Sequence, residues 1–162
     1  EKLLLEFPQA SLYMIYHEDE LVNEVNDKII NSAILKPSVH LLGAIPHLII
    51  EAYYNSADYF VLGSHYEGSG YALSEALRCG CVPIVTDIPS FRMMTNGGQL
   101  GPLWQPDNSN SFVDAVNQAM ARPIQEEGKK CIEYYKQVLS FDAIARTALK
   151  YYQQAAANRS KI

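Results

Sequence analysis

Short apolar segments alternate with helix-like stretches along this chain, and this alternation restricts the fold more than any other feature. Five segments rich in apolar, β-branched and aromatic residues predict strands: Ser11–Tyr16, Val39–Leu42, Tyr59–Leu62, Pro83–Thr86 and Gly101–Trp104. The intervening and following stretches predict helices: Glu1–Phe7, Asp19–Ser32, His47–Asn55, Tyr71–Cys79, Ser109–Ala121, Glu126–Leu139 and Phe141–Ala156. Strands separated in this way need crossover connections. The sequence therefore predicts an α/β fold, a Rossmann-like doubly wound parallel sheet with helices on both faces.

Charge and composition argue against several classes of protein. The formal net charge is −5, whereas a nucleic-acid binder needs grouped Lys and Arg, so no nucleic acid is expected as a partner. No apolar run approaches the roughly 20 residues that span a bilayer, and Glu1–Glu6 carries charges of both signs, unlike a signal peptide. Cys79, Cys81 and Cys131 lack redox or zinc spacing, so we expect buried thiols. These features predict a cytoplasmic protein without a transmembrane segment.

One loop concentrates the residues that can do chemistry. In doubly wound sheets, ligands bind beyond the carboxyl ends of the strands, and Ser64–Ala76 follows the strand at Tyr59–Leu62 and leads into a helix. Gly68 and Gly70 allow a tight turn and a close approach of the backbone to a ligand. The start of the helix offers unpaired N–H groups and a partial positive charge, which suit phosphate oxygens.

Two glutamates flank this turn. A bound diphosphate would repel Glu67 and Glu75, so we expect both carboxylates to accept hydrogen bonds from hydroxyl groups. Carboxylate, phosphate-binding turn and carboxylate together fit a ligand with a sugar, a diphosphate and a second sugar in series. That ligand is a nucleotide sugar. The alternative is that the Gly-x-Gly turn is only a turn, and that the glutamates are only favourable charges near a helix start.

The spacing of Glu67 and Glu75, with seven residues between them, resembles the paired-glutamate motif of retaining glycosyltransferases of the GT-B fold, in family four. Further segments are similar to other motifs of that family: Val39–Gly43, Tyr54–Ser64, Glu75–Asp87 and Gly101–Pro106. The resemblance implies that this chain is the C-terminal, nucleotide-sugar-binding lobe of a two-lobed enzyme. It covers most of the stretch from Val39 to Val116.

The resemblance also implies a role for each matching residue. Glu75 would accept hydrogen bonds from the ribose, and Glu67 would contact the donor sugar near the reacting carbon as the catalytic residue. Sugar and diphosphate would be held by the backbone amides of Gly68, Ser69, Gly70, Tyr71 and Ala72. The base would lie against Gly43, Ala44 and Ile45. The family works by hexosyl transfer with retained configuration and typically without a metal, so we expect no cofactor beyond the nucleotide-sugar substrate.

The chain departs from the family pattern in places. Ser69 stands where an aromatic residue is common. No Arg or Lys matches the basic pair that neutralises the diphosphate, and no segment matches the first strand that carries it. We therefore expect residues 1–162 to be one donor-binding lobe, inactive alone, with a carbohydrate or lipid-linked acceptor held by an N-terminal lobe. Arg92 and His65 are weaker candidates for ligand contacts, and solvated surface positions are the alternative for both.

Three arrangements can compensate for a missing central strand. The strand at Ser11–Tyr16 can pair directly with Tyr59–Leu62, a second chain can supply a strand in a homodimer, or the N-terminal part packs poorly. We favour direct pairing or a strand from a partner. The alternative function is a nucleotide-sugar-binding or scaffolding module that performs no transfer. The sequence identifies neither the base and sugar of the donor nor the acceptor.

Overall fold

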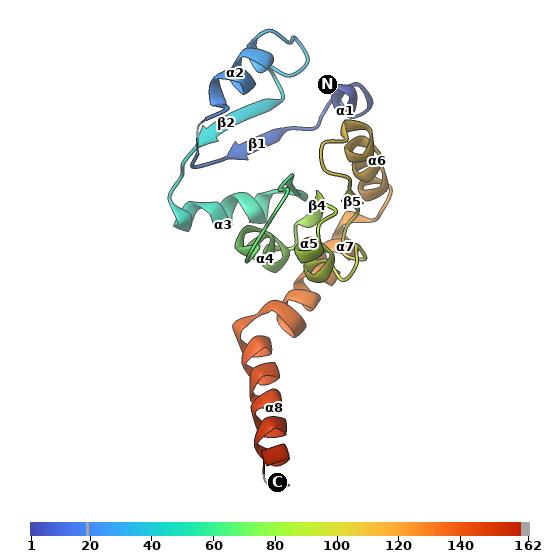
Figure 1. The fold of residues 1–162 in the computed structure, drawn as a ribbon. Coiled ribbons are helices and arrows are strands. Elements are labelled where there is room, and N and C mark those ends of the chain that lie inside the picture. The colour runs from blue at the N-terminus through green and yellow to red at the C-terminus, as the bar shows by residue number, and fades with distance from the viewer. Residues whose placement is uncertain (19, 160–162) are drawn as a thin grey trace. The chain divides into compact units, whose positions relative to one another are not determined.

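The computed structural model describes residues 1–18 and 20–159, and it divides them into two compact units. The first unit is Glu1–Ala52 and the second is Tyr53–Ile162. Figure 1 labels helices and strands of both units. Asp19, the predicted first residue of the second helix, lies outside the described residues.

In the first unit, two parallel strands form a small sheet. β1 (Leu12–Ile15) pairs with β2 (Val39–Gly43). The rings of Tyr13 and His40, which are partners in this register, stack with their centroids 4.7 Å apart. The helices of this part of the chain are α1 (Lys2–Glu6), α2 (Val22–Ile30) and α3 (His47–Ser56). The boundary between the two units falls within α3.

In the second unit, three parallel strands lie in the order β3-β4-β5. They are β3 (Tyr59–Leu62), β4 (Val82–Thr86) and β5 (Leu103–Trp104). β4 is the central strand, and each of its five residues is buried. The helices of this unit are α4 (Tyr71–Cys79), α5 (Pro89–Met94), α6 (Ser109–Met120), α7 (Ile124–Tyr134), the π-helix η1 (Tyr135–Leu139) and α8 (Phe141–Arg159). The predicted α/β class with parallel strands is confirmed.

The core of the second unit forms around β4. Its buried cluster consists of Leu73, Leu77, Val82, Val85, Ile88, Phe91, Met94, Leu100 and Cys131. Fully burying one large apolar side chain of this kind contributes about 1.5–3 kcal/mol relative to leaving it in water. Leu73 and Leu77 of α4 are completely buried, so the helix that follows the candidate loop is held firmly against the sheet.

Two predicted helix ends are confirmed by their capping residues. Gly80 ends α4 with a left-handed φ of +87°, a backbone conformation that glycine adopts without strain. Asn108 begins α6, where its side-chain oxygen accepts hydrogen bonds from the amides of Asn110 and Ser111 at 3.1 and 3.0 Å. The predicted burial of the thiols is confirmed for Cys81 and Cys131, and burial is the main cause that raises the pKa of each to about 12. Cys79 is only half-buried.

The favoured pairing of Ser11–Tyr16 with Tyr59–Leu62 is wrong. Within the described residues β1 pairs with β2, and β3 pairs with β4, so the chain forms two parallel sheets and not one. In a doubly wound sheet the second and fourth strands are not neighbours, because each flanks the first strand on a different side.

Other differences from the predicted elements are local. α5 was not predicted, because it has only six residues and begins with Pro89 after an extended Ile88. The predicted helix Glu126–Leu139 divides into α7 and the π-helix η1. The fifth strand is restricted to Leu103–Trp104, and α8 continues past Ala156 to Arg159.

Glu127 is a buried carboxylate in the first turn of α7. Its side chain is 7% exposed and forms ion pairs with Lys130 and with Arg122, whose Nη1 lies 3.5 Å from Oε2. The hydrogen bond from Lys130 lowers the pKa of Glu127, and burial of the carboxylate opposes this effect. The folded protein therefore favours the charged form of Glu127.

We expect Glu127→Gln to lower the free energy of unfolding at neutral pH by about 1–3 kcal/mol, as for other hydrogen bonds to charged groups. Because the folded pKa lies below the unfolded value of about 4.3, the stabilisation is present above that value and is lost as the pH falls through the folded pKa. Urea unfolding at several pH values should show the difference between wild type and variant shrinking on acidification. Glu126→Gln, at an exposed position in the same turn, is the control. A difference that does not depend on pH would contradict this account.

Candidate functional site

The candidate site lies at the carboxyl ends of the strands in the second unit. The loop that follows β3 begins at Gly63, and the Thr86 hydroxyl at the end of β4 donates a hydrogen bond to the Ser64 carbonyl at 2.5 Å. Thr86 is completely buried. The central strand therefore fixes the starting point of the loop that carries Glu67 and Gly70.

Glu67 closes the turn before α4. The amide of Gly70 donates a hydrogen bond to Glu67 Oε1 at 3.1 Å, and Gly70 is the N-cap residue of the helix. Among the described residues, no side chain forms a capping hydrogen bond at the start of α4, and the first amides of a helix have no acceptor within the helix itself. One carboxylate oxygen of Glu67 thus accepts a hydrogen bond within the turn. The amides of Tyr71 and Ala72 lie at the start of α4, where none of the described side chains caps the helix.

The two glycines of the turn differ in what the fold requires of them. Gly70 has a left-handed φ of +61°, and a Cβ built on it would lie 2.5 Å from Met94 Sδ. Gly68 does not have a left-handed φ, and a Cβ built on it would meet no atom within 4 Å. The fold therefore needs glycine at position 70, whereas at position 68 it leaves open, exposed space.

Glu75 lies one turn further along α4 and is half-buried. Burial raises the pKa of the nearby Tyr54 to about 12, and the negative charge of Glu75 is the second cause of this rise. Tyr54 packs edge-on against Phe60, with ring centroids 5.9 Å apart. Tyr54 begins one of the segments that resemble the family, but the sequence indicated no role for it. Only the fold reveals that it lies in the electrostatic field of Glu75.

The remaining predicted contacts of the loop lie at its surface. Ser69, Tyr71 and Ala72 are exposed, as is Gly68, whereas Gly70 is buried. The second unit thus places the predicted residues from Glu67 to Ala72 around a single turn, with Glu75 following on the same helix.

The predicted base-contacting residues belong to the first unit. Gly43 ends β2 with a left-handed φ of +67°, and its carbonyl accepts a hydrogen bond from the Tyr16 amide at 3.2 Å. Ala44, which follows, is exposed, and Ile45 is half-buried. These residues therefore occupy the carboxyl end of a parallel strand, where a ligand of such a sheet is expected.

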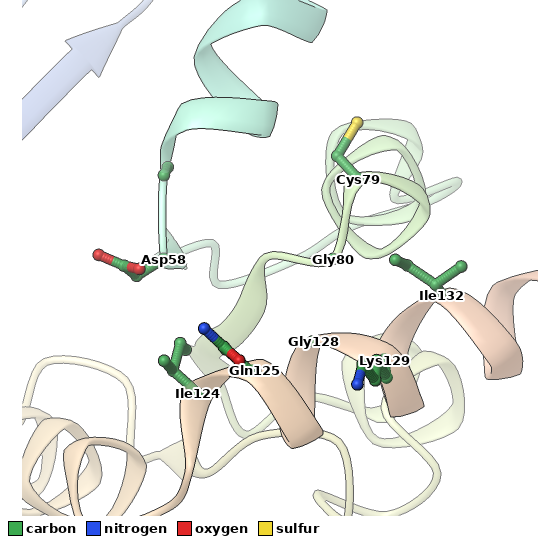
Figure 2. Close-up of a pocket in the computed structure, with 9 residues that line it drawn as sticks. Asp58, Cys79, Gly80, Ile124, Gln125, Gly128, Lys129 and Ile132 are labelled. Atoms are coloured by element: carbon green, nitrogen blue, oxygen red, sulfur yellow. The ribbon is translucent and has the colours of Figure 1, made fainter.

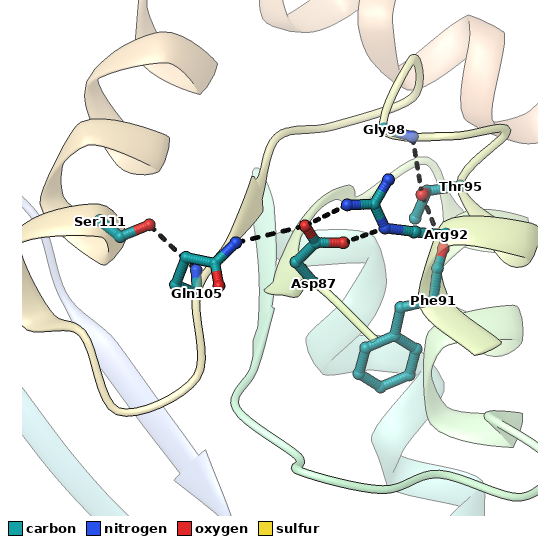
Figure 3. A network of polar contacts seen from close by, with 7 residues as sticks. All are labelled: Asp87, Phe91, Arg92, Thr95, Gly98, Gln105 and Ser111. Atoms are coloured by element: carbon teal, nitrogen blue, oxygen red, sulfur yellow. Dashed lines mark hydrogen bonds and ion pairs between the residues drawn. The ribbon is translucent and has the colours of Figure 1, made fainter. Parts of the chain in front are cut away.

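Arg92, one of the two weaker candidates for a ligand contact, already has a carboxylate partner. Its guanidinium bridges both oxygens of Asp87, with Nη2 donating to Oδ2 at 2.5 Å (Figure 3). The Asp87 side chain is 12% exposed, and Gln105 Nε2 reaches Oδ2 at 3.5 Å. His65 likewise has an acidic neighbour, Asp107, at 3.2 Å. The charge of Arg92 is therefore largely neutralised within the fold.

A pocket of about 350 Å³ lies elsewhere in the second unit (Figure 2). Its lining includes Asp58, which precedes β3, and Gly80, which precedes β4, together with Lys129 of α7. This pocket is thus at the amino ends of the strands, away from the loop that carries Glu67. It contains none of the predicted site residues.

The described residues lack two further features, a metal-binding cluster and a membrane-spanning helix. No three or more His, Cys, Asp or Glu side chains gather there in a way that can hold a metal ion. None of the described helices combines the length and the apolar character needed to cross a bilayer. Metal-independent chemistry and a cytoplasmic location both stay predictions.

Comparison with solved structures shows the fold. Sucrose-phosphate synthase from Thermosynechococcus elongatus superposes with a TM-score of 0.76 at 23% identity, over 97% of this chain and 41% of that one. The C-terminal domain of a glycosyl transferase group 1 family protein from Francisella tularensis superposes with a TM-score of 0.74 at 18% identity, over 86% of this chain and 75% of that domain.

Comparison of sequences shows the family. A GDP-mannose:cellobiosyl-diphosphopolyprenol alpha-mannosyltransferase from Xanthomonas campestris is 34% identical over 115 residues, which are 70% of this chain and 30% of the relative. The chain therefore spans about a third of the length of that relative. Residues 18–138 match the family described as glycosyl transferases group 1, a stretch that includes every predicted site residue. This chain belongs to the glycosyl transferases group 1 family.

Proposed function

We propose that this chain is the donor-binding lobe of a glycosyltransferase that transfers a hexosyl group from a nucleotide-diphosphate sugar with retained configuration. One observation carries the proposal. Within the family match, an exposed turn with open space at Gly68 leads into α4, whose start has no side-chain cap in the described part of the chain. A glycine that the fold itself does not require is expected where a ligand approaches the backbone closely.

The start of α4 suits the diphosphate of the donor. Helix N-termini combine free amides with a partial positive charge, and both favour phosphate oxygens. The amides from Gly68 to Ala72 would hold the diphosphate and the sugar, and they would stabilise the charge that develops on the leaving nucleotide. Since Arg92 is paired with Asp87, the basic groups of the reaction would come from the remainder of the whole protein.

Each of the two glutamates would contact one of the two sugars of the donor. Glu67 uses Oε1 for the Gly70 amide, and its second oxygen would accept a hydroxyl of the transferred sugar. Glu75 would accept the ribose hydroxyls from its half-buried place on α4. Gly43, Ala44 and Ile45 would provide backbone contacts for the base.

The acceptor would bind to a second lobe of the whole protein. The relative from Xanthomonas campestris is named for a GDP-mannose donor and a diphosphopolyprenol-linked acceptor, and a lipid-linked saccharide is therefore the first acceptor to test. The competing function is a module that binds nucleotide sugars without transferring them. The presence of both glutamates argues against a scaffold that binds no donor, because such a scaffold needs neither, and a measurement of turnover separates transfer from binding alone.

The proposal is tested with the full-length protein and a panel of GDP-, UDP- and ADP-linked hexoses. We expect calorimetry to find one nucleoside diphosphate that binds, and the matching sugar donor to support transfer in the presence of a chelator. Loss of transfer on chelation would overturn only the metal-independent mechanism. Binding without transfer to any acceptor would favour the non-catalytic module, and no binding of any nucleotide would overturn the proposal.

The roles of the two glutamates predict different defects. Glu75→Gln should weaken binding of the nucleoside diphosphate by about 1–3 kcal/mol, the usual contribution of a hydrogen bond to a charged group. Glu67→Ala should lower turnover far more than it weakens that binding. Glu67→Gln, which keeps an oxygen for the Gly70 amide, separates the charge from the turn. Glu133→Gln, at an exposed position on α7, is the control. Equal losses of affinity and turnover in Glu67→Ala would refute this division.

The two glycines predict a second contrast. Gly70→Ala should lower the free energy of unfolding by about 1–3 kcal/mol or more, because alanine is strained at a left-handed φ and its Cβ meets Met94. Gly68→Ala should leave stability within about 0.5 kcal/mol, as most surface substitutions do, but should weaken donor binding. Chemical denaturation and calorimetry measure the two effects. Unchanged donor binding in Gly68→Ala would remove this residue from the site.

A further inference from the structure

α5, which the sequence did not predict, contacts the candidate loop through one side chain. Met94, at the end of this helix, is 6% exposed. Its Sδ and Cε would lie 2.5 and 2.9 Å from a Cβ on Gly70, so the thioether fills the space directly beside the Gly70 backbone. Gly70 in turn donates its amide to Glu67. Met94 is therefore separated from the Glu67 carboxylate by a single glycine.

Several contacts of the second unit hold α5 in place. Arg92 forms an ion pair with the Asp87 carboxylate just after β4, as Figure 3 shows. The Tyr134 hydroxyl donates to the Met93 carbonyl at 3.2 Å. Phe91 is completely buried, and its carbonyl accepts a hydrogen bond from the Thr95 hydroxyl at 2.7 Å. A helix of six residues does not hold its own geometry, so these contacts determine where Met94 lies.

We infer that Met94 is a positioning residue of the donor site: it holds the Gly70 turn in the conformation in which Glu67 faces the transferred sugar. The inference rests on the proposed function of Glu67. A long, flexible thioether suits this role, because it can fill the irregular space beside a glycine backbone. α4 itself is held separately by Leu73 and Leu77, which are completely buried. Loss of Met94 should therefore disturb the Glu67 turn more than the helix that binds the nucleotide.

Kinetics of the full-length enzyme with its best nucleotide-sugar donor test this role. Met94→Ala should lower kcat about tenfold, since small misplacements of a catalytic group are costly. The Kd of the free nucleoside diphosphate should rise by a smaller factor, because the amides of Tyr71 and Ala72 belong to α4, which Leu73 and Leu77 hold separately. Met94→Leu, which keeps the volume, should restore kcat to within about twofold of wild type. Leu100→Ala is the matched control, because Leu100 belongs to the same buried cluster and is also 6% exposed.

Leu100→Ala should lower the melting temperature as Met94→Ala does but leave kcat near wild type. If both variants lower kcat equally, or if Met94→Leu is as slow as Met94→Ala, the positioning role is wrong. If wild type transfers no sugar from any donor, the proposed function fails, which is a different result.

A double-mutant cycle tests the contact without any ligand. Gly70→Ala should lower the melting temperature less in the Met94→Ala background than in wild type, because the new Cβ no longer meets the thioether. The strain of the left-handed φ should remain in both backgrounds. Fully additive melting shifts would show that Met94 does not lie against Gly70, and they would overturn the inference whatever the enzyme transfers.

Discussion

The candidate site depends on the burial and pairing of β4. This strand pairs with β3 on one side and β5 on the other, and all five of its residues are buried. Because the strands are parallel, their carboxyl ends lie at the same edge of the sheet. Thr86 is the last residue of β4 at this edge, and Asp87 follows it directly. Thr86 fixes the loop after β3 through the Ser64 carbonyl, and Asp87 fixes α5 through Arg92. Two elements therefore determine the position of Glu67: β4, through Thr86 and the loop after β3, and α5, through Met94 and Gly70.

Much of the fold could be predicted where local signals were complete. α4 begins and ends at its predicted residues, since Gly70 and Gly80 mark both of its ends with left-handed backbone conformations. The partner of β1 could not be read in the same way, because strand pairing depends on contacts that are distant in the sequence. α5 escaped prediction for a related reason: its six residues have no helical periodicity of their own, and Arg92 and Phe91 stabilise it only through tertiary contacts.

The sequence predicted which residues form the candidate site, but not what each of them does in the fold. The sequence indicated the same role for Gly68 and Gly70. The left-handed φ of Gly70 and its contact with Met94, twenty-four residues further along, show that the fold needs glycine at position 70 and not at position 68. In the same way, the spacing of Glu67 and Glu75 gave no sign that Glu67 also accepts the Gly70 amide. This hydrogen bond links the proposed sugar contact to the local stability of the turn.

The most direct test of the central claim is hydrogen exchange of the full-length protein with and without a nucleoside diphosphate that binds it. Amides held by a ligand exchange more slowly, and peptides from the protein report where. The account predicts slower exchange in peptides that cover Gly68 to Ala72, and unchanged exchange in peptides from α7, which lines the pocket at the amino ends of the strands. Binding that leaves the amides from Gly68 to Ala72 unprotected would contradict it.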